Sequence, residues 1–327
     1  MRAAVCKSLI GPEGIVIEDL PVPEPGPGEV RVRVKAVGIN FLDTLMTRGK
    51  YQHKPELPFS PGAEIAGEIE TLGEGVEGFS PGQRVCAYLG WGGAREFVIV
   101  REEQLIPVPE GVSYEVAAGI NVTYGTAIHG LKERGRLQAG ETVAVLGAAG
   151  GAGLAAVEVA KRLGATVIAV ASSPEKLEVC RQHGADLLLN YTTTDLKQGL
   201  RDLTGGRGVD IIYDCVGGDY SEPALRSTAP MGRFLVVGFA AGQIPRIPLN
   251  LVLLKSCDVV GVLMGESARR SPKRHRENIE TVLKWVAEGE LTPHTHAALP
   301  LTDTAEAIRM LDRREATGKV IVTVQPD

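Results

Sequence analysis

Four closely spaced glycines carry the clearest chemical signal in the sequence. An apolar run at 143–146 precedes glycines at 147, 150, 151 and 153, a helical pattern continues to about residue 163, and a second apolar run covers 167–171. This order predicts a strand, a tight turn, a helix and a strand, as in the first unit of a dinucleotide-binding sheet. Glycine lets a pyrophosphate approach the backbone without meeting a Cβ, and the helix N-terminus offers free N–H groups.

The pyrophosphate contacts are therefore expected at Gly150, Gly151, Ala152 and Gly153. The spacing from Gly147 to Gly153 is G-x-x-G-x-x-G rather than the strict G-x-G-x-x-G. A tight turn in another kind of α/β protein is the alternative. The strands on both sides of the glycines favour the nucleotide.

The residues that follow the second strand indicate which nucleotide binds. NAD-specific sites place an Asp or Glu there to accept the ribose 2′-OH. This chain has Ser172 and Ser173, followed by Pro174, Glu175 and Lys176. Two hydroxyls and a cation suit a 2′-phosphate, which predicts NADP(H). Ser173 also fits the N-cap of a helix that begins at Pro174, and it can fill both roles.

Composition limits the class of protein. A length of 327 residues favours two domains, and a net charge of −5 argues against a nucleic-acid binder. The five cysteines include no C-x-x-C pair, which predicts reduced thiols in a cytoplasmic protein. No apolar run reaches the roughly 18 residues of a membrane span, and no signal peptide is expected.

The pattern of elements changes along the chain. The first third is β-rich, with a hairpin in 1–20 that turns at 11–14 and strands at 30–38, 63–73 and 84–90. A helical stretch with Ser113 as N-cap leads to the glycines, and a basic stretch at 269–276 precedes a long helix at 277–288. Six strands are expected at 143–147, 166–171, 187–189, 210–215, 233–238 and 258–263. The predicted fold is an α/β, doubly wound parallel sheet beside a β-rich domain, with ligands beyond the carboxyl ends of the strands.

Three further stretches carry a family resemblance. The first stretch, residues 38–51, contains Asn40, Asp43, Gly49 and Tyr51. The second, residues 59–85, has glycines at 62, 67, 73, 75 and 82. The third is GKVIVTV, at residues 318–324. With the glycine turn, they resemble the zinc-independent medium-chain dehydrogenase/reductases, in the quinone oxidoreductase (zeta-crystallin-like) branch. The resemblance implies a GroES-like catalytic domain (1–121 and 265–327) split around a Rossmann domain (122–264), use of NADPH, and a homodimer.

The resemblance also implies roles for residues of the first domain. Asn40 would lie near the nicotinamide, and Asp43 would shape the substrate site, although turn and N-cap chemistry also explains Asp43. Tyr51 occupies the place of the proposed proton donor of related enoyl-thioester reductases. A partly buried aromatic ring with a satisfied hydroxyl is the alternative for Tyr51. Many quinone oxidoreductases carry a further Tyr where this chain has Leu45, which predicts a more apolar pocket.

The remaining expected cofactor contacts follow the strands of the nucleotide domain. Thr123 matches a family residue near the nicotinamide, and Ser173, Lys176 and Tyr191 are expected to meet the 2′-phosphate and adenine. Ribose and nicotinamide contacts are expected from Val216, Gly217, Gly238 and Phe239. Ordinary packing is the alternative for each, above all for Val216.

No metal site is expected. Zinc-bearing relatives place Cys where this chain has Asn40 and His where it has Ala63, and they carry four closely spaced cysteines. A catalytic zinc needs three strong ligands and a structural zinc needs four. His53, His294, His296 and Glu64 are not at a spacing typical of a zinc site.

The expected activity is a zinc-free, NADPH-dependent hydride transfer to quinones or similar electrophilic enones. Two alternatives stay open: an enoyl-thioester or alkenal reductase on the same scaffold, and a non-enzymatic, crystallin-like NADPH-binding protein. The basic stretch is expected to be a solvated face, although Arg269 or Arg270 could bind a phosphate-bearing or CoA-linked substrate.

Overall fold

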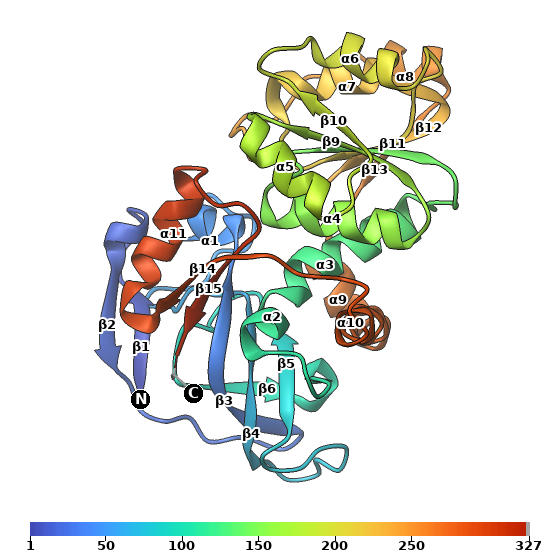
Figure 1. Cartoon of the computed structure of the whole chain (residues 1–327). Coiled ribbons are helices and arrows are strands. Elements are labelled where there is room, and N and C mark those ends of the chain that lie inside the picture. Colours follow the sequence, from blue (N-terminus) through green and yellow to red (C-terminus); the bar gives the residue numbers. More distant parts are fainter. Residues whose placement is uncertain (325–327) are drawn as a thin grey trace. The chain divides into compact units, whose positions relative to one another are not determined.

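The chain forms two compact units in the computed structural model, which describes residues 1–324. Unit 1 contains residues 1–122 together with the chain from 265 onward, and unit 2 contains residues 123–264. Both ends of the chain therefore contribute to unit 1, as the blue and red segments of Figure 1 show. Within the described residues, no helix combines the length and the apolar character needed to cross a bilayer.

Unit 1 is built on two sheets. The predicted N-terminal hairpin is present as β1 (Arg2–Cys6) and β2 (Ile15–Asp19), which pair antiparallel. The larger sheet has the order β14-β15-β3-β4-β5-β7, with β6 paired to β3. Its strands are β3 (Glu29–Ile39), β4 (Glu64–Leu72), β5 (Arg84–Tyr88), β6 (Phe97–Arg101), β7 (Ile106–Pro107), β14 (Thr295–Pro300) and β15 (Lys319–Thr323).

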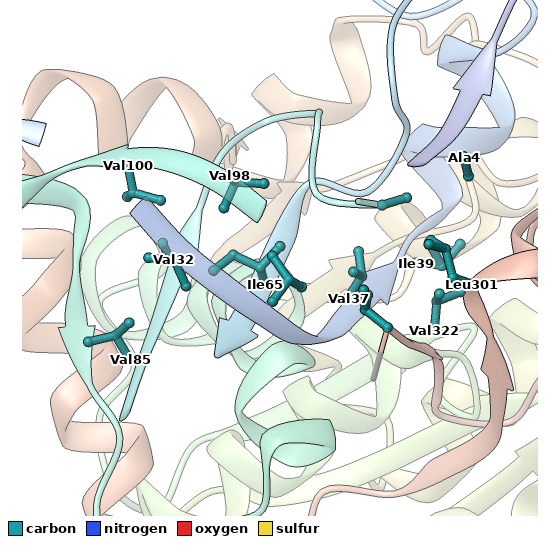
Figure 2. Close-up of a cluster of buried hydrophobic side chains, with 14 of the residues drawn as sticks. Ala4, Val32, Val37, Ile39, Ile65, Val85, Val98, Val100, Leu301 and Val322 are labelled. Carbon is teal, nitrogen blue, oxygen red and sulfur yellow. The ribbon is translucent and has the colours of Figure 1, made fainter. Parts of the chain in front are cut away.

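One face of this sheet forms the core of unit 1. Val37, Ile39, Ile65 and Val322 lie in one buried apolar cluster, which Figure 2 shows between neighbouring strands. Because side chains alternate along a strand, the residues between them point to the opposite face. That face is packed by α2 (Tyr114–Ala118), which lies against β3 and β4.

One helix of unit 1 begins earlier than we expected from the sequence. The helix expected at 277–288 is α10 (Pro272–Ala287), and α9 (Met264–Arg270) precedes it. The predicted start was wrong because Pro272 takes the first helical position, where its missing N–H costs nothing. The other helices are α1 (Phe41–Met46) and α11 (Thr304–Asp312), with 3-10 turns at η1 (Pro12–Gly14), η2 (Glu102–Gln104) and η5 (Leu301–Asp303).

Unit 2 is a six-stranded parallel sheet of order β10-β9-β8-β11-β12-β13. The predicted α/β fold with a doubly wound sheet is confirmed. The strands are β8 (Thr142–Leu146), β9 (Thr166–Ala171), β10 (Leu187–Asn190), β11 (Val209–Asp214), β12 (Thr228–Val236) and β13 (Asp258–Gly261). The helices are α3 (Ile120–Ile128), continued by a π-helical turn η3 (His129–Arg134), α4 (Gly151–Arg162), α5 (Pro174–Gln182), α6 (Leu196–Leu203), η4 (Gly218–Tyr220), α7 (Ser221–Arg226) and α8 (Asn250–Lys255).

The strand β12 starts five residues earlier than the sequence predicted. Its pairing with β11 shifts register between Thr228 and Arg233, and Met231 has a φ of 63°. The irregular stretch around Pro230 interrupts the apolar alternation, so the pattern revealed only the regular half of the strand.

Candidate functional site

The glycine turn has the geometry that a pyrophosphate site needs. Gly147 has a φ of 72°, and α4 begins at Gly151 with Gly150 as its N-cap. A Cβ added to Gly153 would lie 2.1 Å from the Gly147 carbonyl oxygen, so the helix packs directly on the turn. The first N–H groups of this twelve-residue helix, including that of Ala152, have no partner within the helix. A dinucleotide pyrophosphate fits this turn.

The other residues expected at the cofactor site follow neighbouring strands. All pairings in the sheet are parallel, so the carboxyl ends of its strands lie along one edge. The structure therefore brings the expected cofactor-binding residues that follow these strands to the carboxyl end of the sheet. Thr123 is not part of this group, because it lies buried in α3. After β9 comes Ser173, after β10 Tyr191, after β11 Val216 and Gly217, and after β12 Gly238 and Phe239.

Ser173 caps the helix that carries Lys176. The Ser173 Oγ accepts a hydrogen bond from the Lys176 N–H at 3.3 Å, and Pro174 occupies the first helical position. The N-terminus of α5 therefore lies just beyond the carboxyl end of β9. The ring of Tyr191 packs against Tyr220, with 4.7 Å between the ring centroids. Tyr220 was missed because no motif in the sequence contains it.

A buried carboxylate that the sequence analysis missed shapes the loop after β11. Asp214 Oδ1 accepts hydrogen bonds from the N–H groups of Val216 (2.8 Å) and Gly217 (2.9 Å), and Asp214 Oδ2 accepts one from Ser221 Oγ at 2.6 Å. A Cβ on Gly217 would lie 2.7 Å from Phe239 Cδ1, so the loops after β11 and β12 touch. The sequence did contain a signal for Asp214: it is an acidic residue at the end of an apolar strand, shortly before two glycines.

In unit 1, Asp43 joins the start of α1 to the loop before β4. Its two carboxylate oxygens accept the N–H groups of Asn40 and Gly62, both at 2.8 Å. Burial raises the pKa of Asp43 to about 6; these two hydrogen bonds and the charge of Lys319 oppose the increase, and the Glu64 charge adds to it. Asp43 is the N3 residue of α1 rather than its N-cap, and its side chain is fully buried.

Asn40 belongs to a buried network with Glu64 and Lys319. The Lys319 ammonium donates to Asn40 Oδ1 at 2.5 Å and to Glu64 Oε1 at 2.6 Å, and Asn40 Nδ2 donates to Glu64 Oε1 at 2.9 Å. The second amide hydrogen of Asn40 goes to the Gly38 carbonyl at 3.2 Å. Both amide hydrogens are therefore engaged inside unit 1.

The register of the sheet explains how this network forms. Glu64 pairs with Gly38 on one side and with Tyr88 on the other, and Val320 pairs with Ile39. A Cβ on Gly38 would lie 2.3 Å from the Ala118 carbonyl oxygen and 2.7 Å from Glu64 Oε1. The missing side chain of Gly38 leaves the space that the Glu64 carboxylate occupies. Lys319 was missed as a site residue; its signal was a single lysine at the first position of an otherwise uncharged strand.

Tyr51 lies near Asp43, whose charge acts on its phenol. Its ring is half-buried and packs against Cys6, Met46 and Phe59. Burial raises the pKa of the Tyr51 phenol, and the charge of Asp43 adds to the increase. The hydroxyl is therefore protonated at neutral pH and can donate a hydrogen bond.

Comparison with known proteins agrees with this architecture. The model of the alcohol dehydrogenase GroES-like domain matches residues 26–110, and that of the zinc-binding dehydrogenase matches residues 151–288. Quinone oxidoreductase-like protein 2 of Bos taurus is 39% identical over 325 residues, covering 99% of this chain and 93% of the relative. The chain belongs to the quinone oxidoreductase family.

Two further relatives in this family support the assignment, and the expected family is confirmed. Quinone oxidoreductase of Pseudomonas aeruginosa is 34% identical over 314 residues, covering 95% of this chain and 96% of the relative. The crystal structure of Escherichia coli quinone oxidoreductase complexed with NADPH has a TM-score of 0.92 and 27% identity, and the match covers 99% of this chain and all of the other. The fold is thus a GroES-like unit with a Rossmann unit.

A zinc ion does not fit the residues that this member of the quinone oxidoreductase family has at the network. The Glu64 carboxylate already receives the Lys319 ammonium, and the neighbouring positions are an amide and an alanine. Within residues 1–324, no group of three or more His, Cys, Asp or Glu side chains could hold a metal ion.

The basic stretch at 269–276 is partly neutralised by its own helix. Arg269 and Arg270 both pair with Glu266, at 2.8 and 2.6 Å, and their side chains are exposed. These pairs match the expected solvated face.

Proposed function

We propose that the chain is an NADPH-dependent oxidoreductase that transfers hydride to quinones or similar electrophilic enones without a metal ion. One observation carries the proposal. In unit 2 the glycine turn and the Ser173-capped helix lie next to each other, because they follow the carboxyl ends of the adjacent parallel strands β8 and β9. The relatives named as quinone oxidoreductases, one of them solved with NADPH, support this choice.

In this proposal, unit 2 binds and orients the cofactor. Gly150, Gly151, Ala152 and Gly153 would hold the pyrophosphate through backbone N–H groups, and Ser173 and Lys176 would hold the 2′-phosphate. The remaining contacts of unit 2 would come from Thr123, Tyr191, Val216, Gly217, Gly238 and Phe239. The family resemblance adds Asn40 of unit 1 as a contact of the nicotinamide. NADPH supplies the hydride when it is bound.

Unit 1 would supply the proton and position the acceptor. Tyr51 holds a proton on its hydroxyl at neutral pH and would donate it to the acceptor oxygen. Asp43 would act by positioning, because its hydrogen bonds to Asn40 and Gly62 fix the segment that leads to Tyr51.

Rapid mixing of the purified protein with NADPH tests this function. Single-turnover oxidation of NADPH should be observed with 1,4-naphthoquinone and should be slower with an alkenal or an enoyl-CoA. No turnover with any quinone would remove the quinone assignment, and turnover with an enoyl-CoA alone would favour the enoyl-thioester alternative. Tight NADPH binding with no turnover on any acceptor would favour the crystallin-like alternative. Elemental analysis should find far less than one zinc per chain.

We also propose a homodimer in the cytoplasm. The strand β13 forms an edge of the parallel sheet and exposes Val259, and Leu249, Leu253 and Leu254 are exposed near it in the chain. An unpaired edge beside apolar side chains suits pairing with a second copy. The five free cysteines suit a reducing compartment. Light scattering coupled to size exclusion should give about twice the chain mass; a monomer at micromolar concentration would contradict the dimer.

A further inference from the structure

Tyr88 is a second phenol beside the buried network of unit 1, and the sequence analysis did not select it. It ends β5 and pairs directly with Glu64 of β4. Directly opposed residues of antiparallel strands place their side chains on the same face of the sheet, close together. Tyr88 therefore lies on the face that carries the carboxylate of Glu64 and the Lys319 ammonium, and not on the apolar core face.

The tip of the Tyr88 side chain can be located from its neighbours. A Cβ added to Gly265 would lie 2.5 Å from the Tyr88 hydroxyl, so the hydroxyl reaches the chain at the start of α9. The ring meets the His275 ring edge-on, with 6.2 Å between the centroids. His275 in turn is hydrogen-bonded to Asn121 at 3.1 Å. The ring is thus fixed on two sides.

The Tyr88 hydroxyl has no hydrogen-bond partner among residues 1–324, although the ring is largely buried. The hydroxyl is not among the buried side-chain atoms that lack a partner, so it remains accessible to a ligand. Tyr114, on the surface of the same unit, donates to Glu68 at 2.7 Å. Tyr213 in unit 2 also lacks a partner, but it is completely enclosed and no ligand can reach it. Tyr88 differs from Tyr213 because it retains accessible surface.

Tyr88 and Tyr51 share a charged neighbour, because the Asp43 carboxylate raises the pKa of both phenols. Burial raises the pKa of the Tyr88 phenol, and Tyr51, Glu64 and Asp43 add to the increase. Both phenols are consequently protonated over the physiological range, and both can donate hydrogen bonds. A para-quinone has two carbonyl oxygens, whereas an enone or an enoyl thioester has a single carbonyl oxygen conjugated to its double bond.

We propose that Tyr88 is a specificity-determining residue that donates a hydrogen bond to the second oxygen of a quinone, while Tyr51 serves the first. This inference rests on the proposed function and narrows its acceptor to molecules with two oxygens across a ring. Reduction adds a hydride, which brings two electrons, and one proton to the quinone. NADPH becomes NADP⁺, the product is the hydroquinone, and the phenol that gives its proton regains one from solvent.

The test compares Tyr88→Phe with wild type on two acceptors, 1,4-naphthoquinone and cyclohex-2-enone. The kcat/KM for the quinone should fall about tenfold, as expected for one lost hydrogen bond, and that for the enone should stay within about twofold. Tyr114→Phe, which removes a phenol hydroxyl elsewhere in unit 1, should change neither. An equal loss on both acceptors, or no loss on the quinone, would overturn the role of Tyr88.

A second variant moves the hydroxyl without removing it. Gly265→Ala places a methyl group 2.5 Å from the present position of the Tyr88 hydroxyl, which must then move, so it should also lower quinone reduction selectively. In the Tyr88→Phe background, Gly265→Ala should cause little further loss, because the hydroxyl is already absent. Full additivity of the two losses would contradict the proposal. A wild-type protein that reduces neither acceptor would instead refute the proposed function itself.

Discussion

The Lys319 ammonium lies 2.6 Å from Glu64 Oε1, and the two side chains are only 9% and 0% exposed. The pair links β15, at the end of the chain, to β4 of the N-terminal segment. Asn40 bridges both groups, and the Val122 N–H donates to the second Glu64 oxygen at 2.8 Å. Buried charges of this kind are stable only while all partners are present.

Lys319→Met should therefore destabilise unit 1 by about 3–5 kcal/mol, because it leaves the Glu64 carboxylate buried without its cation. Both tryptophans, Trp91 and Trp285, belong to unit 1, so their fluorescence during urea unfolding reports on this unit. Lys7→Met, at the exposed pair with Glu18, should cost less than about 1 kcal/mol. Adding Glu64→Gln to Lys319→Met should recover part of the loss. A cost similar to that of Lys7→Met would refute this account.

The ionisation of Asp43 should make the stability of unit 1 depend on pH. Its folded pKa of about 6 lies above the unfolded value, so the folded state binds more protons between about pH 4 and 6. The contribution of Asp43 is therefore most favourable below pH 4 and is lost as the pH rises through 6. Asp43→Asn does not ionise, so its stability relative to wild type should rise over this range by on the order of 3 kcal/mol.

Tryptophan-monitored urea unfolding at several pH values measures this difference. The single hydrogen bond that Asn cannot accept adds a constant offset and does not change the slope with pH. Glu70→Gln should show the opposite change at lower pH. Arg31 and Arg33 overcome the burial of Glu70 and lower its pKa, so the stability of this variant relative to wild type should fall as the pH rises towards about 4.5. A flat difference between Asp43→Asn and wild type would contradict the raised pKa.

The sequence predicted the sheet of unit 2 well because its signals are local. Each strand is a short apolar run, and the glycine turn needs residues that are adjacent in the chain. The network of unit 1 could not be predicted, because Glu64 and Lys319 are 255 residues apart and only strand register brings them together. Tyr88 was missed for the same reason: its position opposite Glu64 depends on pairing, which no local pattern specifies.

Lys176→Ala should separate the two pyridine cofactors. If the ammonium binds the 2′-phosphate, the affinity for NADPH should fall about 10- to 100-fold, since hydrogen bonds to charged groups contribute about 1.5–3 kcal/mol. The affinity for NADH, which lacks that phosphate, should change little. Calorimetric titration of both cofactors measures the ratio, and Lys284→Ala, an exposed lysine of unit 1, controls for the loss of one charge. Equal losses for NADPH and NADH would exclude a phosphate contact.

Tyr51→Phe should slow enone reduction more than quinone reduction. The enone has one carbonyl oxygen, so loss of the Tyr51 hydroxyl removes its proposed proton donor, and general acid catalysis of this kind contributes about 100-fold or more. A quinone retains the hydrogen bond from Tyr88, so its loss should be about tenfold or less. The preference is thus the reverse of that expected for Tyr88→Phe. Steady-state kcat and KM for 1,4-naphthoquinone and cyclohex-2-enone measure both preferences; if both variants shifted the ratio of the acceptors in the same direction, the division of labour between the two phenols would be wrong.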